Sequence, residues 1–374
     1  MMKFLKSGIL LAIIAVAITA CSSDNDGPTE TNDNFDRGAM LANWADNIII
    51  PAYTSFNSKV VEMEAATAAF NAAPTVENLQ SLRAAWKVAY VSFQNVSMFE
   101  VGKAEDIRFR NRLNVYPTKV AQIEDFIASG NYDFDLPSTI DKQGFPAMDY
   151  MLNGLAENDA EIVTFYTTNS NAVGYKNYLS TLSHTIKSLS NEVLTSWTGG
   201  YRDTFVANTS SSASGAVDKL TNDYIFYFEK ALRAGKVGIP AGIFSNGTLP
   251  QNVEAFYKKD ISKELLLEAI DASVDFFNGK SFNGTSNGES FKTYLDYLNT
   301  IKNGENLSAL INDQFTVAKN KANELNANFV EQIETDNSKM LASYDELQRL
   351  VVLFKVDMVQ AFDVTIDYVD ADGD

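Results

Sequence analysis

Cysteine, histidine and positive charge are all scarce in this sequence. It contains one cysteine, Cys21, and one histidine, His184, so it can form no internal disulfide and no His-Glu-x-x-His zinc site. Its 30 Lys and Arg are outnumbered by 48 Asp and Glu, giving a net charge of −18. Such a charge excludes nucleic acid as a partner, because a basic patch is needed to neutralise phosphates.

Long hydrophobic runs are also few, and the one that stands out lies at the N-terminus. Residues 1–20 combine two lysines with the apolar run Ile9–Ile18, which is short for a membrane span and typical of a signal peptide. The run ends Ile-Thr-Ala-Cys, which resembles the bacterial lipoprotein box and makes Cys21 the lipidated residue. An ordinary secretory signal with an incidental cysteine is the alternative. Residues 21–34 are polar and acidic, which predicts a disordered tether.

These features predict a lipoprotein of the bacterial cell envelope, anchored in the outer membrane. The tether leaves two orientations open, one facing the periplasm and one facing the cell surface.

The rest of the chain has helical periodicity, which predicts an all-α fold. From Thr75 to Phe99, apolar residues recur at intervals of three and four and so share one helical face, with Thr75 as N-cap. Pro51 predicts a kink or break in the first helix. The other expected helices are Asp36–Ala72, Thr118–Ile127, Tyr175–Trp197, Val217–Ala234, Asn252–Phe277, Phe291–Lys302, Leu307–Ile333 and Asp345–Phe362.

The serine-rich segment Ser210–Gly215 is the best candidate for a domain boundary. It predicts an N-terminal helical bundle over residues 35–209 and a C-terminal bundle over residues 210–374. The two halves contain similar numbers of expected helices, as a duplicated four-helix bundle would.

The segment Gly144–Asp149 resembles the Gly-x-His-x-x-Glu motif of the imelysin-like family of bacterial envelope proteins. Here Pro146 stands at the His position and Asp149 at the Glu position. Further similar segments follow in the family's order: Pro51–Phe56, Leu82–Trp86, Asn114–Pro117, Lys236–Pro240, Val253–Tyr257, Asp345–Asp357 and Phe362–Asp374. The resemblance implies two packed helical bundles with the motif near their junction. It also implies an association with iron uptake, and some family members are classed as metallopeptidases.

The motif segment has two interpretations. In the first, Asp149 supplies an oxygen to a hard cation such as Fe³⁺ or Ca²⁺, with Tyr150 beside it. In the second it is a structural turn, in which Gly144 supplies backbone freedom and Pro146 occupies the first turn of a helix. A proline side chain carries no metal-ligating atom, which favours the structural interpretation.

Three other features of the sequence could contribute to a site. His184 lies among polar residues on its expected helix face, which predicts a solvated side chain. Arg108, Arg110 and Arg112 form a cluster that could bind a carboxylate or phosphate, or form salt bridges with nearby acidic residues. The terminal Asp370–Asp374 resembles the start of an EF-hand loop but lacks the distal Glu and the exiting helix.

The leading hypothesis is a non-catalytic, lipid-anchored protein that binds an iron-related or other small ligand where the bundles meet. We expect Asp149, Tyr150, Tyr116 and Lys236 to line this site, with iron or another divalent cation as the candidate cofactor and Asp149 as its ligand. One alternative is a metallopeptidase of the imelysin type. The other is an outer-membrane interaction protein that docks an iron-uptake or other transporter.

Overall fold

The computed structural model describes residues 34–284 and 286–368. The expected signal peptide, Cys21 and the Asp370–Asp374 segment lie outside the described residues. Within that part, nearly all regular structure is helical, apart from one hairpin of β1 (Ile301–Lys302) and β2 (Glu305–Asn306). The predicted all-α class is therefore confirmed. No helix in this part is long and apolar enough to cross a membrane.

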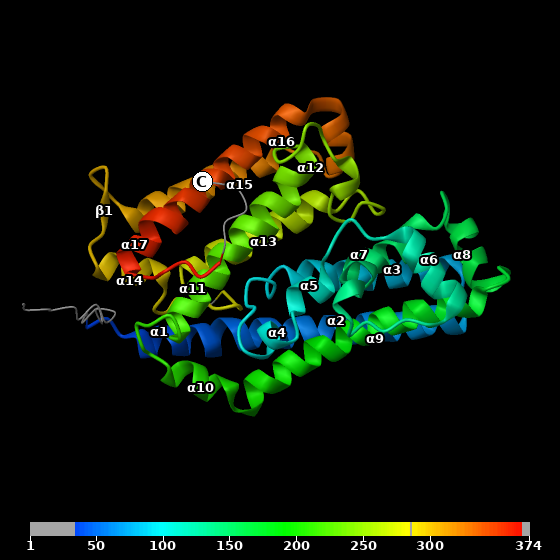
Figure 1. Ribbon diagram of the computed structural model, residues 1–374, viewed down its shortest axis with the longest axis horizontal. Coiled ribbons are helices and arrows are strands. Elements are labelled where there is room, and N and C mark those ends of the chain that lie inside the picture. Colours follow the sequence, from blue (N-terminus) through cyan, green and yellow to red (C-terminus); the bar gives the residue numbers. More distant parts are fainter. Residues whose placement is uncertain (1–33, 285, 369–374) are drawn as a thin grey trace, which may run out of the picture.

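The first half of the chain forms a group of helices around the long pair α2 and α9 (Figure 1). Its α-helices are α1 (Arg37–Asn43), α2 (Ile50–Ala72), α3 (Val76–Phe93), α4 (Lys103–Asp106), α5 (Phe109–Leu113), α6 (Val120–Ser129), α7 (Gly144–Asp149), α8 (Asp159–Thr167), α9 (Ala172–Ser196) and α10 (Arg202–Ala207). Wider or tighter helical turns are η1 (Trp44–Ile49), η2 (Pro137–Lys142), η3 (Tyr150–Gly154) and η4 (Trp197–Tyr201).

The second half packs above the first in the view of Figure 1, with α15 and α16 on its outer side. Its elements are α11 (Ala216–Phe226), η5 (Tyr227–Gly238), α12 (Ile239–Ala241), η6 (Pro250–Asn252), α13 (Ser262–Phe277), α14 (Phe291–Tyr297), α15 (Leu307–Asn323), α16 (Phe329–Val352), η7 (Leu353–Met358) and α17 (Val359–Phe362). Helix α11 continues through η5 into α12 as one long rod.

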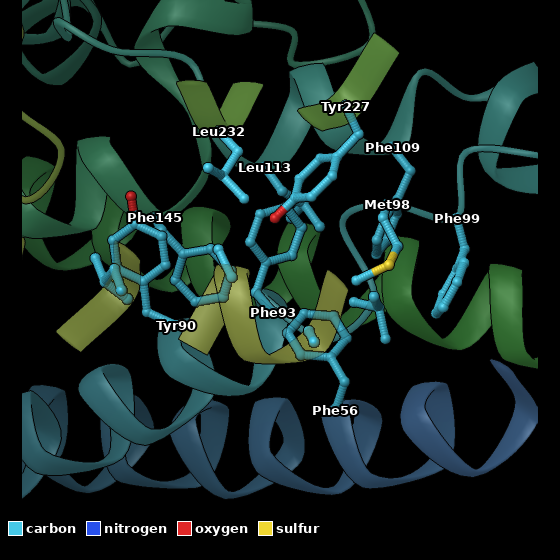
Figure 2. Packing of buried hydrophobic residues seen from close by; sticks show 14 of the residues in the cluster. Phe56, Tyr90, Phe93, Met98, Phe99, Phe109, Leu113, Phe145, Tyr227 and Leu232 are labelled. Carbon is cyan, nitrogen blue, oxygen red and sulfur yellow. The ribbon is translucent and has the colours of Figure 1, made fainter. Parts of the chain in front are cut away.

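One hydrophobic cluster runs through both halves. Figure 2 shows Tyr227 and Leu232 of η5 lying against Phe93, Phe109 and Leu113 of the first half. At the far end, the Trp44 ring packs on Phe276 and Phe291 of the second half, with centroids 5.2 and 4.9 Å apart. The predicted boundary at Ser210–Gly215 falls in the loop between α10 and α11, and the two bundles remain a prediction about domains.

Most predicted helices are present, and Thr75 caps α3 by accepting a hydrogen bond from the Asn78 N–H at 3.2 Å. Four predicted helices were too long: the main helix of 252–277 begins only at Ser262, 291–302 ends at Tyr297, 307–333 is divided after Asn323, and 75–99 ends at Phe93. The first error has a clear cause, since Ala255 and Lys259 adopt left-handed φ values of 57° and 68°. An apolar sequence does not reveal such turns.

The first long helix does not break at Pro51. It runs from α1 through the wider turn η1 into α2, and Pro51 follows that turn directly. Because proline has no N–H, the carbonyl four residues earlier, on Asn47, lacks its usual helical donor. That carbonyl instead accepts a hydrogen bond from the Phe282 N–H at 2.8 Å. The proline therefore leaves an acceptor that the second half uses.

A second contact of the same helix generates the first prediction. The buried Asn43 amide donates to the carbonyls of Gly279 and Glu289, both at 3.1 Å. Asn43→Ala should lower the free energy of unfolding by about 2 kcal/mol, because two buried carbonyls lose their donor. Urea denaturation measures this change. Asn323→Ala, at an exposed helix end, is the matched control, and equal losses in the two variants would contradict the role of Asn43.

Candidate functional site

The motif segment is fixed by a close backbone approach at its first residue. Gly144 has φ of +76°, and a Cβ there would lie 2.2 Å from the Leu113 carbonyl oxygen. Any other residue would therefore clash and be strained. Pro146 follows in the first turn of α7 and is fully buried, as is the rest of that helix. These contacts hold α7 against α5 and orient Asp149 toward the second half.

Asp149 joins the two halves of the molecule. Its side chain is 1% exposed, and its Oδ2 accepts the backbone N–H of Tyr257 at 2.9 Å. Its Oδ1 accepts the N–H of Lys258 and the amide of Asn153, both at 3.0 Å. The carboxylate thus satisfies two backbone donors of the irregular segment 252–261. It fixes the path of that segment across the junction.

The donor set around the motif does not fit a metal ion. Both Asp149 oxygens are already directed at N–H groups, and Pro146 offers no donor where the family motif has histidine. Within residues 34–284 and 286–368, no three His, Cys, Asp or Glu side chains are grouped as a metal site requires. No step of chemistry is therefore derived through a metal at this segment.

The environment of Asp149 predicts a particular dependence of stability on pH. Burial raises the pKa of its carboxyl to about 7, against the opposing effect of the Tyr257, Asn153 and Lys258 donors. The unfolded chain releases this proton near pH ~4. Between these values the folded state holds a proton that the unfolded state has lost, so the contribution of Asp149 to stability falls as pH rises.

Asp149→Asn removes this titration and leaves the side-chain shape. The unfolding free energy of the native protein minus that of the variant should decrease from pH 4.5 to 6.5, by up to about 1.4 kcal/mol per pH unit. Urea titrations at several pH values measure the difference. Parallel curves for the two proteins would show that Asp149 does not titrate in this range.

Lys236 lies in a buried polar network where the halves meet. Its ammonium donates to the Gln94 amide oxygen at 2.8 Å and forms a close ion pair with Glu254, and all three side chains are at most 3% exposed. The other Glu254 oxygen accepts from the Asn114 amide at 2.7 Å, and the Asn114 oxygen accepts from the Tyr90 hydroxyl at 2.5 Å. Burial lowers the pKa of Lys236, and the Glu254 carboxylate opposes this shift. The network links α3, the 114–117 loop, η5 and the segment held by Asp149.

This ion pair generates the next prediction. Lys236→Met should destabilise the fold by about 3–5 kcal/mol, because it leaves the Glu254 charge buried without a partner. The double variant Lys236→Met/Glu254→Gln should recover roughly half of that loss or more, since no unpaired charge remains. Lys59→Met, which removes an exposed pair with Glu62, is the control and should cost under about 0.5 kcal/mol. If the single and double variants lost the same free energy of unfolding, the unpaired Glu254 charge would not be the cause of the loss.

A cavity of about 250 Å³, which we call the junction cavity, opens above this network. Its lining comes from both halves of the chain: Phe93, Gln94, Ser97, Arg110, Asn111, Asn114, Val115, Tyr116, Phe226, Tyr227, Lys230, Ala231, Gly235, Lys236, Ile239 and Asn252. Apolar walls with a few convergent polar groups are typical of small-molecule sites.

A smaller hollow of about 200 Å³ lies beside the motif, and its wall includes Pro146, Asp149 and Tyr116. Tyr116 therefore belongs to both spaces, while Lys236 lines only the junction cavity. The structure thus brings three of the four predicted lining residues to one region. Tyr150 lines neither space and instead donates its hydroxyl to Glu124 at 2.5 Å.

The remaining candidates are placed as follows. His184 is solvated, with its side chain 69% exposed and 3.0 Å from Glu64, as expected. Arg110 is buried and paired with Asp223 at 2.7 Å and Glu100 at 3.3 Å. Salt bridging is therefore the role that the structure shows for it. Its partners are not the acidic residues nearest in sequence to the arginine cluster, since the side chain points inward.

Sequence reasoning missed Gln94, Asn114 and Glu254 as members of the network. Two of them, Asn114 and Glu254, lie in segments that carry the family resemblance, 114–117 and 253–257. This resemblance is the one feature of the sequence that could have marked them as site residues. Their pairing could not be read from the sequence, because the interacting atoms are separated by up to 142 positions.

With this geometry established, comparison with known proteins identifies the family. The model of the imelysin family matches residues 49–354. The chain belongs to the imelysin family. The resemblance seen in the sequence is thereby confirmed, and the degenerate motif at Gly144–Asp149 is a departure within that family.

Two solved structures share the fold of this imelysin-family chain. An imelysin-like protein from Psychrobacter arcticum superposes with a TM-score of 0.69, covering 89% of this chain and 97% of its own, at 14% identity. A protein from Parabacteroides distasonis, described as an iron-regulated protein A precursor, gives 0.66, with 90% and 98% covered at 16% identity. Identities this low show the fold alone.

A curated relative matches a short part of the sequence. Iron-regulated protein A from Synechococcus elongatus is 27% identical over 77 residues, which is 21% of this chain and 22% of that protein. The chain thus matches only about a fifth of that relative's length.

Proposed function

We propose that this imelysin-family chain is a non-catalytic, lipid-anchored envelope protein that captures a small ligand in the junction cavity. The observation that carries the proposal is the construction of the cavity. Residues from both halves line it, and two of them, Gln94 and Lys236, belong to a buried network with Glu254. Burying an ion pair is costly, and proteins with no use for one can replace it with apolar side chains.

Metal-dependent peptide hydrolysis has less support. A hydrolytic zinc needs about three protein ligands and an open position for water. Pro146 replaces the motif histidine, Asp149 is engaged by backbone donors, and His184 is on the surface. An iron-related role is proposed on the strength of the named relatives, with the metal reaching this protein in complexed form and not as a bare ion bound by Asp149.

The location of the protein is proposed from the sequence of residues 1–34. After removal of the signal peptide, acyl chains on Cys21 would anchor it in the outer membrane, with the 21–34 tether giving reach. A transporter of the same membrane is the partner we expect to receive the ligand. Co-purification from native membranes, compared with a Cys21→Ser variant, tests both the anchor and the partner.

Ligand capture is tested by thermal unfolding of the full-length protein in detergent. A panel of small carboxylates, phosphates, sugars, amines and aromatic compounds is screened, because binding to the folded state raises the melting temperature. At least one class should raise the melting temperature of the native protein and leave that of Ala231→Phe unchanged. This substitution fills the cavity from its wall.

The control is Ala361→Phe, which places the same ring at a separate surface hollow beside the β1–β2 hairpin. It should keep the ligand response. A panel in which no compound distinguishes the native protein from Ala231→Phe would remove the ligand-capture proposal. Chelator-sensitive cleavage of a protein substrate, lost in Asp149→Ala, would instead establish the metallopeptidase.

A further inference from the structure

The charges that line the junction cavity have one sign. Arg110, Lys230 and Lys236 reach its surface, and no Asp or Glu is among the described residues that line it. The whole protein has the opposite bias, with 48 acidic residues against 30 basic ones. A random patch of this surface would therefore present more carboxylates than cations.

Each lining cation has a carboxylate partner that lies outside the cavity lining. Lys236 pairs with Glu254, and Lys230 pairs with Glu229 at 2.8 Å. Arg110 pairs with Asp223 and Glu100, which line a separate hollow on its other side. These acids hold the cations in place from behind. The positive group of each pair is nearer to the cavity than its carboxylate. The electrostatic potential inside the cavity is therefore positive, and charges in these buried surroundings are weakly screened.

The neutral polar groups of the lining are suited to the same kind of ligand. The Tyr227 hydroxyl is buried, and its hydrogen-bonding neighbour is the Ser97 side chain, which opposes the rise of the Tyr227 pKa and so leaves the phenol proton for a ligand. Burial raises the pKa of Tyr116 and of Tyr227, so both phenols keep their protons at neutral pH and can donate them. The Arg110 guanidinium lies 5.4 Å from the Tyr227 ring centre, which adds positive potential close to that hydroxyl.

We propose that the ligand of the junction cavity is a small organic anion with an apolar body, held by the positive lining and by the Tyr227 hydroxyl. The apolar body would lie against Phe93, Phe226 and Ile239, and the acidic group would face the cations. This proposal rests on the proposed function and specifies its ligand class. The positive groups that line the cavity also disfavour a bare metal cation there.

Three ring compounds of similar size and different charge provide the test. Benzoate, benzamide and benzylamine are titrated calorimetrically into the full-length protein in detergent. Benzoate should bind about tenfold more tightly than neutral benzamide, as one charge-assisted hydrogen bond predicts, and benzylamine should bind more weakly than both. Equal affinity for all three, or preference for benzylamine, would overturn the anion proposal while leaving ligand capture intact. No binding of any of the three would overturn the anion proposal, whereas ligand capture would fall only if the wider panel of compounds also gave no response.

Two variants locate the effect in the cavity. Lys230→Gln should weaken benzoate about tenfold and leave benzamide unchanged, and Glu229 then keeps the Tyr368 hydroxyl and Lys355 as partners. Tyr227→Phe should weaken benzoate about fivefold, because it removes one donor. Lys319→Gln makes the same charge change in a different cleft and should alter neither affinity. An equal loss in Lys319→Gln would show that only net charge matters, and would overturn the site.

A further titration separates two sources of the anion. Citrate alone represents a free organic acid, and citrate loaded with ferric ion represents an anionic metal chelate. Tighter binding of either form than of benzylamine upholds the anion preference, and their ratio identifies the source. Binding of neither form, together with tight binding of benzylamine, would contradict it.

Discussion

The hydrogen bonds between the Asp149 carboxylate and the backbone of Tyr257 and Lys258 are the constraint on which the junction depends. They hold an irregular segment that makes two left-handed turns and would otherwise have unpaired, partly buried donors. The same segment carries Glu254 to Lys236, and Lys236 in turn reaches Gln94 at the end of α3. In this chain the acid at position 149 therefore has a structural role, as the acceptor for two backbone donors.

Pro146, which stands at the histidine position of the motif, fits the same geometry. Pro146 lies in a fully buried helical turn whose first residue approaches the Leu113 carbonyl closely. A proline fits the first turn of a helix because its missing N–H would have no helical partner there. The segment is therefore a packed structural turn, and the polar network of the junction lies on the other side of Tyr116.

Much of this could be predicted from the sequence. Apolar spacing gave the long helices, since a helix that packs on a core needs one apolar face. Lys236 and Tyr116 were predicted through segments that resemble the family, and both line the junction cavity. The Asp149 contacts were beyond reach, because they involve main-chain groups whose orientation depends on the φ of Ala255. The positive lining of the cavity could not be predicted either. The sequence does not show which member of each ion pair faces the cavity and which lies behind it.

The hydrogen bond between the Asn47 carbonyl and the Phe282 N–H shows how a missing atom can specify an assembly. Any residue other than proline at position 51 would bring its own N–H to this wide turn, within reach of the Asn47 and Asp46 carbonyls. The loop around Phe282 would then compete with a local donor for a single acceptor. Pro51 thus leaves one backbone carbonyl of the helix without a local donor. A distant loop bonds to it through its own backbone, and no side chain takes part in that hydrogen bond.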